Sequence, residues 1–309
     1  MIFFFTDYNL RTMILKNLAI KGGGVRGVAY VGALQVLEEN NLLNGIQRVA
    51  GTSAGALLSG MICAGYDAGQ IKELMLQLDF RKFESGWNPL RILRSYGLYS
   101  GDYILDFIHK FLKKSPKNLP SNVTFSQMAD AGCKHLYAFA CDLNMHSVAE
   151  FSVEKTPDVL VAEAIRASMS IPIFFKAWQF TDANPNDHMY VDGGVAFNYP
   201  LLFFDNPRFT SNPDLICEEA FGLFLYDVNG KRKNDLSRNR PKKYIKVLFE
   251  TLMETQNIDF NFDAALSRRS IIIDGLGVPA TDFNLDGDII ESLIESGRKG
   301  ALQFLEKDN

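Results

Sequence analysis

The chain has 309 residues, of which 47% are hydrophobic and 22% are charged. This composition is typical of a globular protein that buries a large core, and it excludes a disordered or fibrous chain. Its 36 acidic and 32 basic residues give a net charge of −4, which excludes a global attraction to nucleic acid.

The sequence predicts neither a membrane span nor a cysteine-based site. No stretch reaches the roughly 20 apolar residues that cross a bilayer, and the N-terminal segment lacks the pattern of a cleaved signal. We therefore expect a soluble protein, cytoplasmic by default or exported without a cleaved signal. Cys63, Cys133, Cys141 and Cys217 show no C-x-x-C spacing, which favours buried free thiols over a zinc site or a disulfide framework.

Short apolar runs alternate with amphipathic runs along the chain. Strands are predicted at 17–21, 46–50, 135–142, 147–153, 189–192, 220–226 and 270–274. Helices are predicted at 26–40, 54–65, 68–79, 102–113, 158–169, 241–256 and 287–305. The alternation predicts an α/β fold with a largely parallel central sheet and helices on both faces.

No linker divides the chain into separate domains. We expect one domain with an N-terminal extension at 1–16 and a catalytic core at 17–205. The remaining residues, 206–309, are expected to complete the sheet and its helical cover.

A glycine-rich turn, "KGGGVRG", follows the first predicted strand. Gly22, Gly24 and Gly27 have the G-x-G-x-x-G spacing of dinucleotide-binding turns. Backbone N–H groups at a helix N-terminus stabilise a phosphate or an oxyanion equally well. A dinucleotide site also needs an acidic residue at the end of the second strand, and none is present there. A dinucleotide-binding protein therefore remains only as an alternative.

The second predicted strand ends in "GTSAG". Gly51, Ser53 and Gly55 form G-x-S-x-G between a strand and a helix. This context is typical of a nucleophile elbow, in which a strained turn exposes a serine Oγ at the carboxyl edge of the sheet. We predict that Ser53 is a nucleophile; the structural alternative is a serine that caps the following helix.

Attack by a serine on a carbonyl creates an oxyanion that needs fixed hydrogen-bond donors. The N–H groups of Gly22, Gly23, Gly24 and Ala54 are predicted to supply them. Arg26, at the start of the following helix, is predicted to add positive potential or to order the loop.

Ser53 also needs a proton acceptor, and Asp192 is the favoured candidate. It ends the predicted strand at 189–192, and Gly193 and Gly194 allow a tight turn close to other backbone. A carboxylate within hydrogen-bond reach of Ser53 would complete a Ser–Asp dyad.

A second serine mechanism would use Asp142 and His188, in the order Ser, Asp, His of α/β-hydrolases. Neither residue stands in a recognisable loop signature. We therefore favour the dyad and expect His188 to be a structural or surface residue.

Two polar segments allow both a structural and a functional interpretation. The basic segment 227–243 is either a solvated connector or a contact with anionic lipid headgroups or a partner. The segment "DFNLDGDII" (282–290) begins like an EF-hand loop, but Leu293 stands where the bidentate glutamate belongs. Capping of the following helix is therefore favoured over calcium binding.

The motifs "GGGVRG", "GTSAG" and "DGG" occur together in an order that resembles the patatin-like phospholipase family. The resemblance covers about residues 17–205 and includes the connecting blocks "GLYSGDYILDFI", "TFSQMA" and "AIRASMSIPIFF". One departure is Lys21, where many family members have a short polar or acidic residue.

The resemblance implies a three-layer α/β sandwich that cleaves fatty acyl esters of phospholipids and other lipids. Ser53 would be the nucleophile that forms an acyl-serine, Asp192 the base, and residues 22–24 with Arg26 the oxyanion loop. It implies no metal and no cofactor. The substrate would be an acyl lipid met by peripheral contact with a membrane, and a protein activator is left open. A catalytically idle member that binds lipid or a partner is the other alternative.

Two segments that flank Asp192 are rich in Phe and Leu, "SIPIFFKAWQF" (170–180) and "FNYPLLFF" (197–204). Lipid substrates require an apolar acyl channel, which these segments can line. Ordinary core is the alternative for any individual aromatic residue among them.

Overall fold

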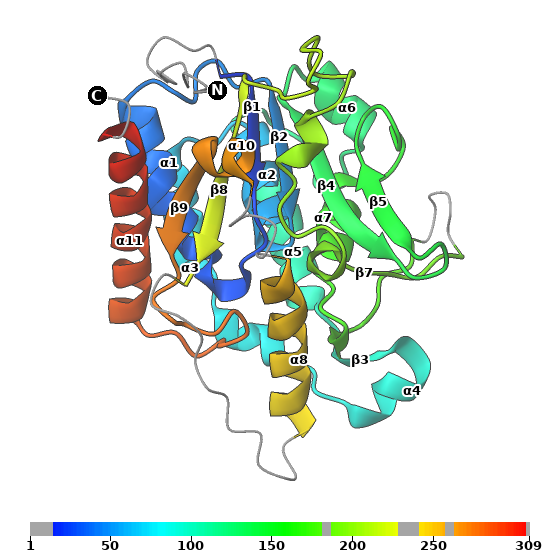
Figure 1. Ribbon diagram of the computed structural model, residues 1–309. Helices are drawn as coiled ribbons and strands as arrows, with labels where there is room; N and C mark the ends of the chain where they lie inside the picture. Colours follow the sequence, from blue (N-terminus) through cyan, green and yellow to red (C-terminus); the bar gives the residue numbers. More distant parts are fainter. Residues whose placement is uncertain (1–14, 181–186, 228–240, 257–262, 307–309) are drawn as a thin grey trace.

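The computed structural model describes residues 15–180, 187–227, 241–256 and 263–306. Its strands are β1 (Asn17–Ile20), β2 (Arg48–Thr52), β3 (Gly97–Tyr99), β4 (His135–Asp142), β5 (Ser147–Phe151), β6 (Ile173–Phe175), β7 (Tyr190–Asp192), β8 (Ala220–Tyr226) and β9 (Ser270–Asp274). Within the described ranges, seven strands form one sheet in the order β5-β4-β2-β1-β8-β9, with β7 also paired to β4 (Figure 1). Strands β3 and β6 form a separate two-stranded sheet.

The longer helices are α1 (Ala29–Glu39), α2 (Ala54–Cys63), α3 (Ala68–Gln77), α5 (Asp102–Lys113), α7 (Val161–Ser168), α8 (Pro241–Thr255) and α11 (Gly287–Glu306). Shorter helical segments are η1 (Gly24–Val28), η2 (Phe80–Glu84), η3 (Pro89–Arg91), α4 (Ile92–Ser95), α6 (Phe125–Asp130), η4 (Gly193–Val195), η5 (Leu202–Phe204) and α10 (Ala264–Arg268). Over the described part of the chain, no helix combines the length and the apolar character needed to cross a membrane.

The centre of the large sheet is parallel. Strand β1 pairs in parallel with β2 and β8, β2 pairs in parallel with β4, and β8 with β9. Strands β5 and β7 are antiparallel to β4. Every residue of β1 is buried, as expected for a parallel strand that is covered on both faces. The predicted α/β fold with a largely parallel central sheet is confirmed.

Two apolar clusters lie on the two faces of the sheet, because successive side chains of a strand point to opposite faces. Leu18 and Ile20 belong to the main cluster, which also contains buried residues of α1, α2, α5, α7 and α11. Ala19 belongs to the second cluster. The second cluster is covered by α10 and by the segment 197–209. The cover of this face therefore consists of one short helix and an aromatic loop segment.

The two segments expected to line an acyl channel are separated by this arrangement. Phe174 and Phe175 lie in the main cluster, whereas Leu201 and Phe204 lie in the second cluster. All four side chains are buried. These four residues are core residues of two different clusters.

Most predicted elements match in position, but β2 differs in a way that matters. The apolar run predicted a strand at 46–50, whereas β2 spans Arg48–Thr52. Its pairing with β4 continues through Gly51 and Thr52, so the strand runs directly into Ser53. Strands β3 and β6, each three residues long, were not predicted because so short a run has no measurable periodicity.

Helices α1 and α11 pack closely because each has a glycine at the contact. A Cβ at Gly297 would lie 1.8 Å from Ala29 O, and a Cβ at Gly32 would lie 1.9 Å from Ile294 O. Asp286 caps the start of α11 by accepting a hydrogen bond of 2.8 Å from Ile289 N. The prediction that the carboxylates of 282–290 cap this helix is confirmed for Asp286.

We expect Gly297→Ala to lower the free energy of unfolding by about 1–3 kcal/mol, because the added methyl group forces two helix backbones apart. Gly287→Ala is the matched control on the same helix, since a Cβ there meets nothing within 4 Å. This control should stabilise the protein by up to about 1 kcal/mol. Urea unfolding followed by circular dichroism measures the free energy of unfolding of both variants. Equal stability of Gly297→Ala and wild type would contradict the close contact between α1 and α11.

Candidate active site

Strand β4 brings the ends of β2 and β7 together. Strand β2 pairs with β4 as far as Thr52, opposite Phe139, and β7 pairs with the next part of β4, with Asp192 opposite Ala140. Strand β5 occupies the other edge of β4 over these residues. Strands β2 and β7 therefore lie end to end along one edge, and Ser53, which follows Thr52, lies beside Asp192.

Ser53 occupies a strained turn between β2 and α2, with φ 54° and ψ −123°. Such a backbone conformation costs a residue with a side chain about 1–3 kcal/mol. The turn is possible because Gly51 and Gly55 are in contact: a Cβ on Gly51 would lie 2.4 Å from the Gly55 backbone. The side chain of Ser53 makes no capping hydrogen bond to α2, which contradicts the alternative of a simple helix cap.

Ser53 Oγ donates a hydrogen bond of 2.6 Å to Asp192 Oδ2. The other carboxylate oxygen, Oδ1, accepts a hydrogen bond of 2.8 Å from Gly194 N. Ser53 is 4% exposed and Asp192 is 0% exposed. Burial raises the pKa of Asp192 to about 7, against the opposing effect of the hydrogen bonds from Ser53 and Gly194. A carboxylate in this position can accept the hydroxyl proton of Ser53.

Residues at the end of α7 hold both members of this pair. Ser53 N donates a hydrogen bond of 2.8 Å to Ser168 Oγ, and Asp192 N donates one of 2.8 Å to Ser170 O. The buried Arg166 donates from Nη1 to Ser170 Oγ at 2.7 Å. None of these three supporting residues was predicted. The available signal was an arginine and two serines within an otherwise apolar run, "AIRASMSIPIFF".

The glycine turn after β1 lies against the start of α2. A Cβ on Gly27 would lie 2.9 Å from Ala54 Cβ, and a Cβ on Gly24 would lie 2.0 Å from Ala280 O. Gly24 also has a φ of 58°, a conformation that glycine adopts at little cost. The structure therefore places the turn beside the residue that follows Ser53.

The backbone N–H groups of this turn are not equivalent. Gly22 N donates a hydrogen bond of 2.9 Å to Asn198 O, so this group is already engaged. Among the described residues, no acceptor binds the N–H groups of Gly23, Gly24 or Ala54. Three of the four predicted donors are therefore unoccupied.

Arg26 is buried and pairs with two carboxylates. Its Nη1 lies 3.1 Å from Asp227 Oδ2, and its Nη2 lies 3.4 Å from Glu254 Oε1. Its Nε donates to Gly23 O at 3.4 Å. Of the two roles predicted for Arg26, this geometry favours ordering of the loop, because two carboxylates balance the positive charge.

Lys21, the residue that departs from the family pattern, is held against β8. Its Nζ donates a hydrogen bond of 2.9 Å to Leu225 O and lies 4.6 Å from the centre of the Phe224 ring. Burial, together with the nearby Arg26, lowers the pKa of Lys21 to about 7. The amino group of Lys21 therefore contacts the second cluster.

The end of α8 contacts the turn that follows Asp192 (Figure 1). Gln256, directly after this helix, donates from Nε2 to Gly194 O at 2.6 Å and accepts from Asn198 N at 2.8 Å. The buried side-chain amide of Asn198 has no hydrogen-bond partner among the described residues. Its Oδ1 lies close to both Gly22 and Gly194. The amide of Asn198 is therefore a polar group beside the site, and a bound ligand can form hydrogen bonds with it. The sequence patterns did not single out Asn198 or Gln256.

The alternative triad is only half assembled. His188 Nδ1 lies 2.7 Å from Asp142 Oδ2, so these two residues do pair. On β4, Asp142 lies opposite Tyr190, whereas Asp192 lies opposite Ala140, two residues earlier in the strand. Ser53 Oγ is bonded to Asp192 instead. His188 is thus a partner of Asp142, as expected for a structural histidine.

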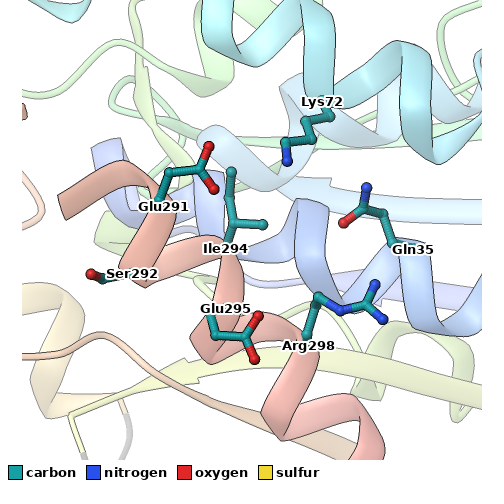
Figure 2. A pocket seen from close by; sticks show the side chains of 7 residues that line it. All are labelled: Gln35, Lys72, Glu291, Ser292, Ile294, Glu295 and Arg298. Carbon is teal, nitrogen blue, oxygen red and sulfur yellow. The ribbon is translucent and has the colours of Figure 1, made fainter. Parts of the chain in front are cut away.

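Three other candidates are the basic segment, a metal site and a surface groove. Most of the basic segment 227–243 and the first 14 residues lie outside the described residues. Across the described ranges, no group of three or more His, Cys, Asp or Glu side chains could hold a metal ion. Figure 2 shows a groove lined by Gln35, Lys72, Glu291, Ser292, Ile294, Glu295 and Arg298. Its volume is about 520 Å³. None of these residues belongs to the dyad or to the glycine turn.

Comparisons with known proteins agree on one family. A family model for patatin-like phospholipases matches residues 18–205. The protein YqhO of Bacillus subtilis (strain 168) is 30% identical over 308 residues, which cover 93% of this chain and 96% of YqhO. The probable lipid hydrolase 463L of Invertebrate iridescent virus 6 is 27% identical over 63% of this chain and 65% of the viral protein.

Among solved structures, VipD from Legionella pneumophila superposes with a TM-score of 0.64. The match covers 95% of this chain and 67% of VipD at 16% identity, so it shows a shared fold. The family match includes the glycine turn, Ser53 and Asp192 in one continuous range of more than half of the chain. The chain belongs to the patatin-like phospholipase family.

Proposed function

We propose that this protein hydrolyses carboxylic esters of lipids, with Ser53 as nucleophile and Asp192 as base. The observation that carries the proposal is the 2.6 Å hydrogen bond between Ser53 Oγ and Asp192 Oδ2 at the end of two strands that share an edge of β4. Membership of the patatin-like phospholipase family supports lipid esters as the substrate class. The name of the viral relative, a probable lipid hydrolase, supports the same class.

The proposed reaction has two steps. Asp192 accepts the hydroxyl proton while Ser53 Oγ attacks the ester carbonyl carbon, and the tetrahedral intermediate collapses to an acyl-serine. The departing alcohol takes the proton from Asp192. Asp192 then accepts a proton from water, and the hydroxide attacks the acyl-serine. The fatty acid leaves as Asp192 returns this proton to Ser53 Oγ, which restores both residues.

The oxyanion needs donors that are already in place, and the unoccupied N–H groups of Gly23, Gly24 and Ala54 suit this role. Gly22 is assigned to holding the turn, since its N–H group binds Asn198 O. Arg26 is assigned to ordering the loop through Gly23 O.

Arg166, Ser168 and Ser170 are assigned as positioning residues. Burial lowers the pKa of Arg166 to about 10, so the guanidinium remains charged at neutral pH. Its positive charge acts to lower the pKa of Asp192, which favours the carboxylate form that a base requires.

We expect Ser53→Ala and Asp192→Asn each to reduce kcat by about three orders of magnitude or more, because each removes a group that acts only during bond breaking. Fatty acid release from phospholipid vesicles and from a monomeric ester measures the loss. His188→Ala is the matched control, since His188 pairs with Asp142 and not with Ser53. Near-normal turnover in either dyad variant, or a comparable loss in the control, contradicts the assignment.

The pH dependence should report on Asp192. Protonated Asp192 cannot accept the Ser53 proton, so kcat/KM should rise with pH through a midpoint near the raised pKa of about 7. Below the midpoint the rate should fall about tenfold per pH unit. Steady-state hydrolysis of a monomeric ester, with melting curves at each pH as a control for folding, measures this profile. A profile that stays flat between about pH 5 and pH 8 would refute a base with this pKa.

A further inference from the structure

The segment between η2 and α5 exposes an unusual number of large apolar side chains. Trp87 is 53% exposed, Leu90 70%, Leu93 81% and Tyr96 58%. Ile173 is 39% exposed and lies beside them, because β6 pairs with β3 at the residue after Tyr96. We call these five residues the apolar patch. Single exposed apolar residues are ordinary, whereas a contiguous group marks an interaction surface.

The charge of this segment differs from that of the whole chain. Residues 85–101 contain Arg91 and Arg94 and no acidic residue, although the whole chain has a net charge of −4. Arg94 is exposed, while Arg91 is used locally and donates to Gly86 O and Leu98 O. Aromatic and leucine side chains next to arginine suit the headgroup region of an anionic membrane.

The apolar patch lies at the end of the fold where the dyad is located. Figure 1 shows α4 and β3 at the end of the molecule toward which the arrows of β8 and β9 point. Buried Arg166 donates to Ser100 O at 3.0 Å and to Gly101 O at 3.2 Å, and also to Ser170 Oγ. Ser170 O accepts a hydrogen bond from Asp192 N. The side chain of Arg166 therefore links the exposed segment to the residue that holds Asp192.

A second exposed apolar stripe lies at the same end of the fold. Helix α8 exposes Tyr244, Leu248 and Leu252, and their spacing of four residues puts them on one helix face. Lys246 Nζ of α8 lies 2.9 Å from Oε1 of Glu84, the last residue of η2. This ion pair connects α8 to the residue that directly precedes the exposed segment.

We propose that the apolar patch, together with Arg94, is the surface by which the protein docks on an anionic phospholipid bilayer. The wide exposure of the apolar side chains and the excess of positive charge in this segment are complementary to such a surface. The inference deepens the proposed function, because docking at this end would present the dyad to lipid esters. Docking itself requires no turnover.

The test uses the full-length Ser53→Ala variant, which leaves the lipid intact, in flotation with phosphatidylcholine vesicles with and without about 30 mol% phosphatidylserine. We expect stronger binding to the anionic vesicles, weakened by added salt. In this background Leu93→Glu should weaken binding to both vesicle types about tenfold or more. Arg94→Glu should weaken binding about tenfold, and on the anionic vesicles only. Leu76→Glu, at a leucine of α3 that is 47% exposed, is the matched control and should bind unchanged.

Leu90→Ser provides a second, independent variant of the patch, and melting curves confirm that each variant is folded. Full binding by both Leu93→Glu and Leu90→Ser, or an equal loss in Leu76→Glu, overturns the proposal. It is also overturned if these patch variants change only self-association, measured by sedimentation, because a second copy of the chain would then cover the patch. Hydrolysis of a monomeric ester by the unmutated protein is measured separately. Activity without vesicle binding contradicts docking alone, and vesicle binding without activity contradicts the proposed function alone.

Discussion

The hydrogen bond from Ser53 to Asp192 joins residues 139 positions apart in the chain, and it depends on the pairing of β4. The first part of β4 fixes the end of β2, and the next residues fix the end of β7. A shift of one residue in either pairing would turn side chains to the opposite face of the sheet. Ser168, the last residue of α7, and Ser170, which follows this helix, secure the same arrangement, so a strand and the end of a helix together hold the site.

This arrangement stabilises two features that are unfavourable by themselves. Ser53 has a strained backbone, and the carboxylate of Asp192 is removed from water, which raises its pKa from 3.8 to about 7. Because the folded-state pKa lies above the unfolded value, the contribution of Asp192 to stability is greatest below about pH 3.8 and is lost as the pH rises toward 7. At the pH where Asp192 can act as a base, the fold therefore carries a cost that the rest of the core must offset.

Local patterns predicted the parts of the site that local chemistry determines. The elbow around Ser53 requires glycines within two residues, and the positions of β4, β8 and β9 follow from apolar runs with clear limits. Contacts between distant segments could not be predicted in this way. The hydrogen bond from Gly22 N to Asn198 O and the support by Arg166 depend on how separate elements pack. The same is true of the segments beside Asp192, whose aromatic residues divide between two clusters.

Gln256 gives the turn after Asp192 a direct connection to a surface helix, because its side chain binds both Gly194 O and Asn198 N. Gly194 N in turn donates a hydrogen bond to Asp192 Oδ1, so α8 is linked through a single turn to the carboxylate that binds Ser53. Burial is the main cause of the raised pKa of Asp192, so this pKa depends on how closely the turn and its neighbours pack around the carboxylate. The proton affinity of this carboxylate is therefore set in part by a surface helix that follows it by about 50 residues in the chain, and not by the Ser53–Asp192 pair alone.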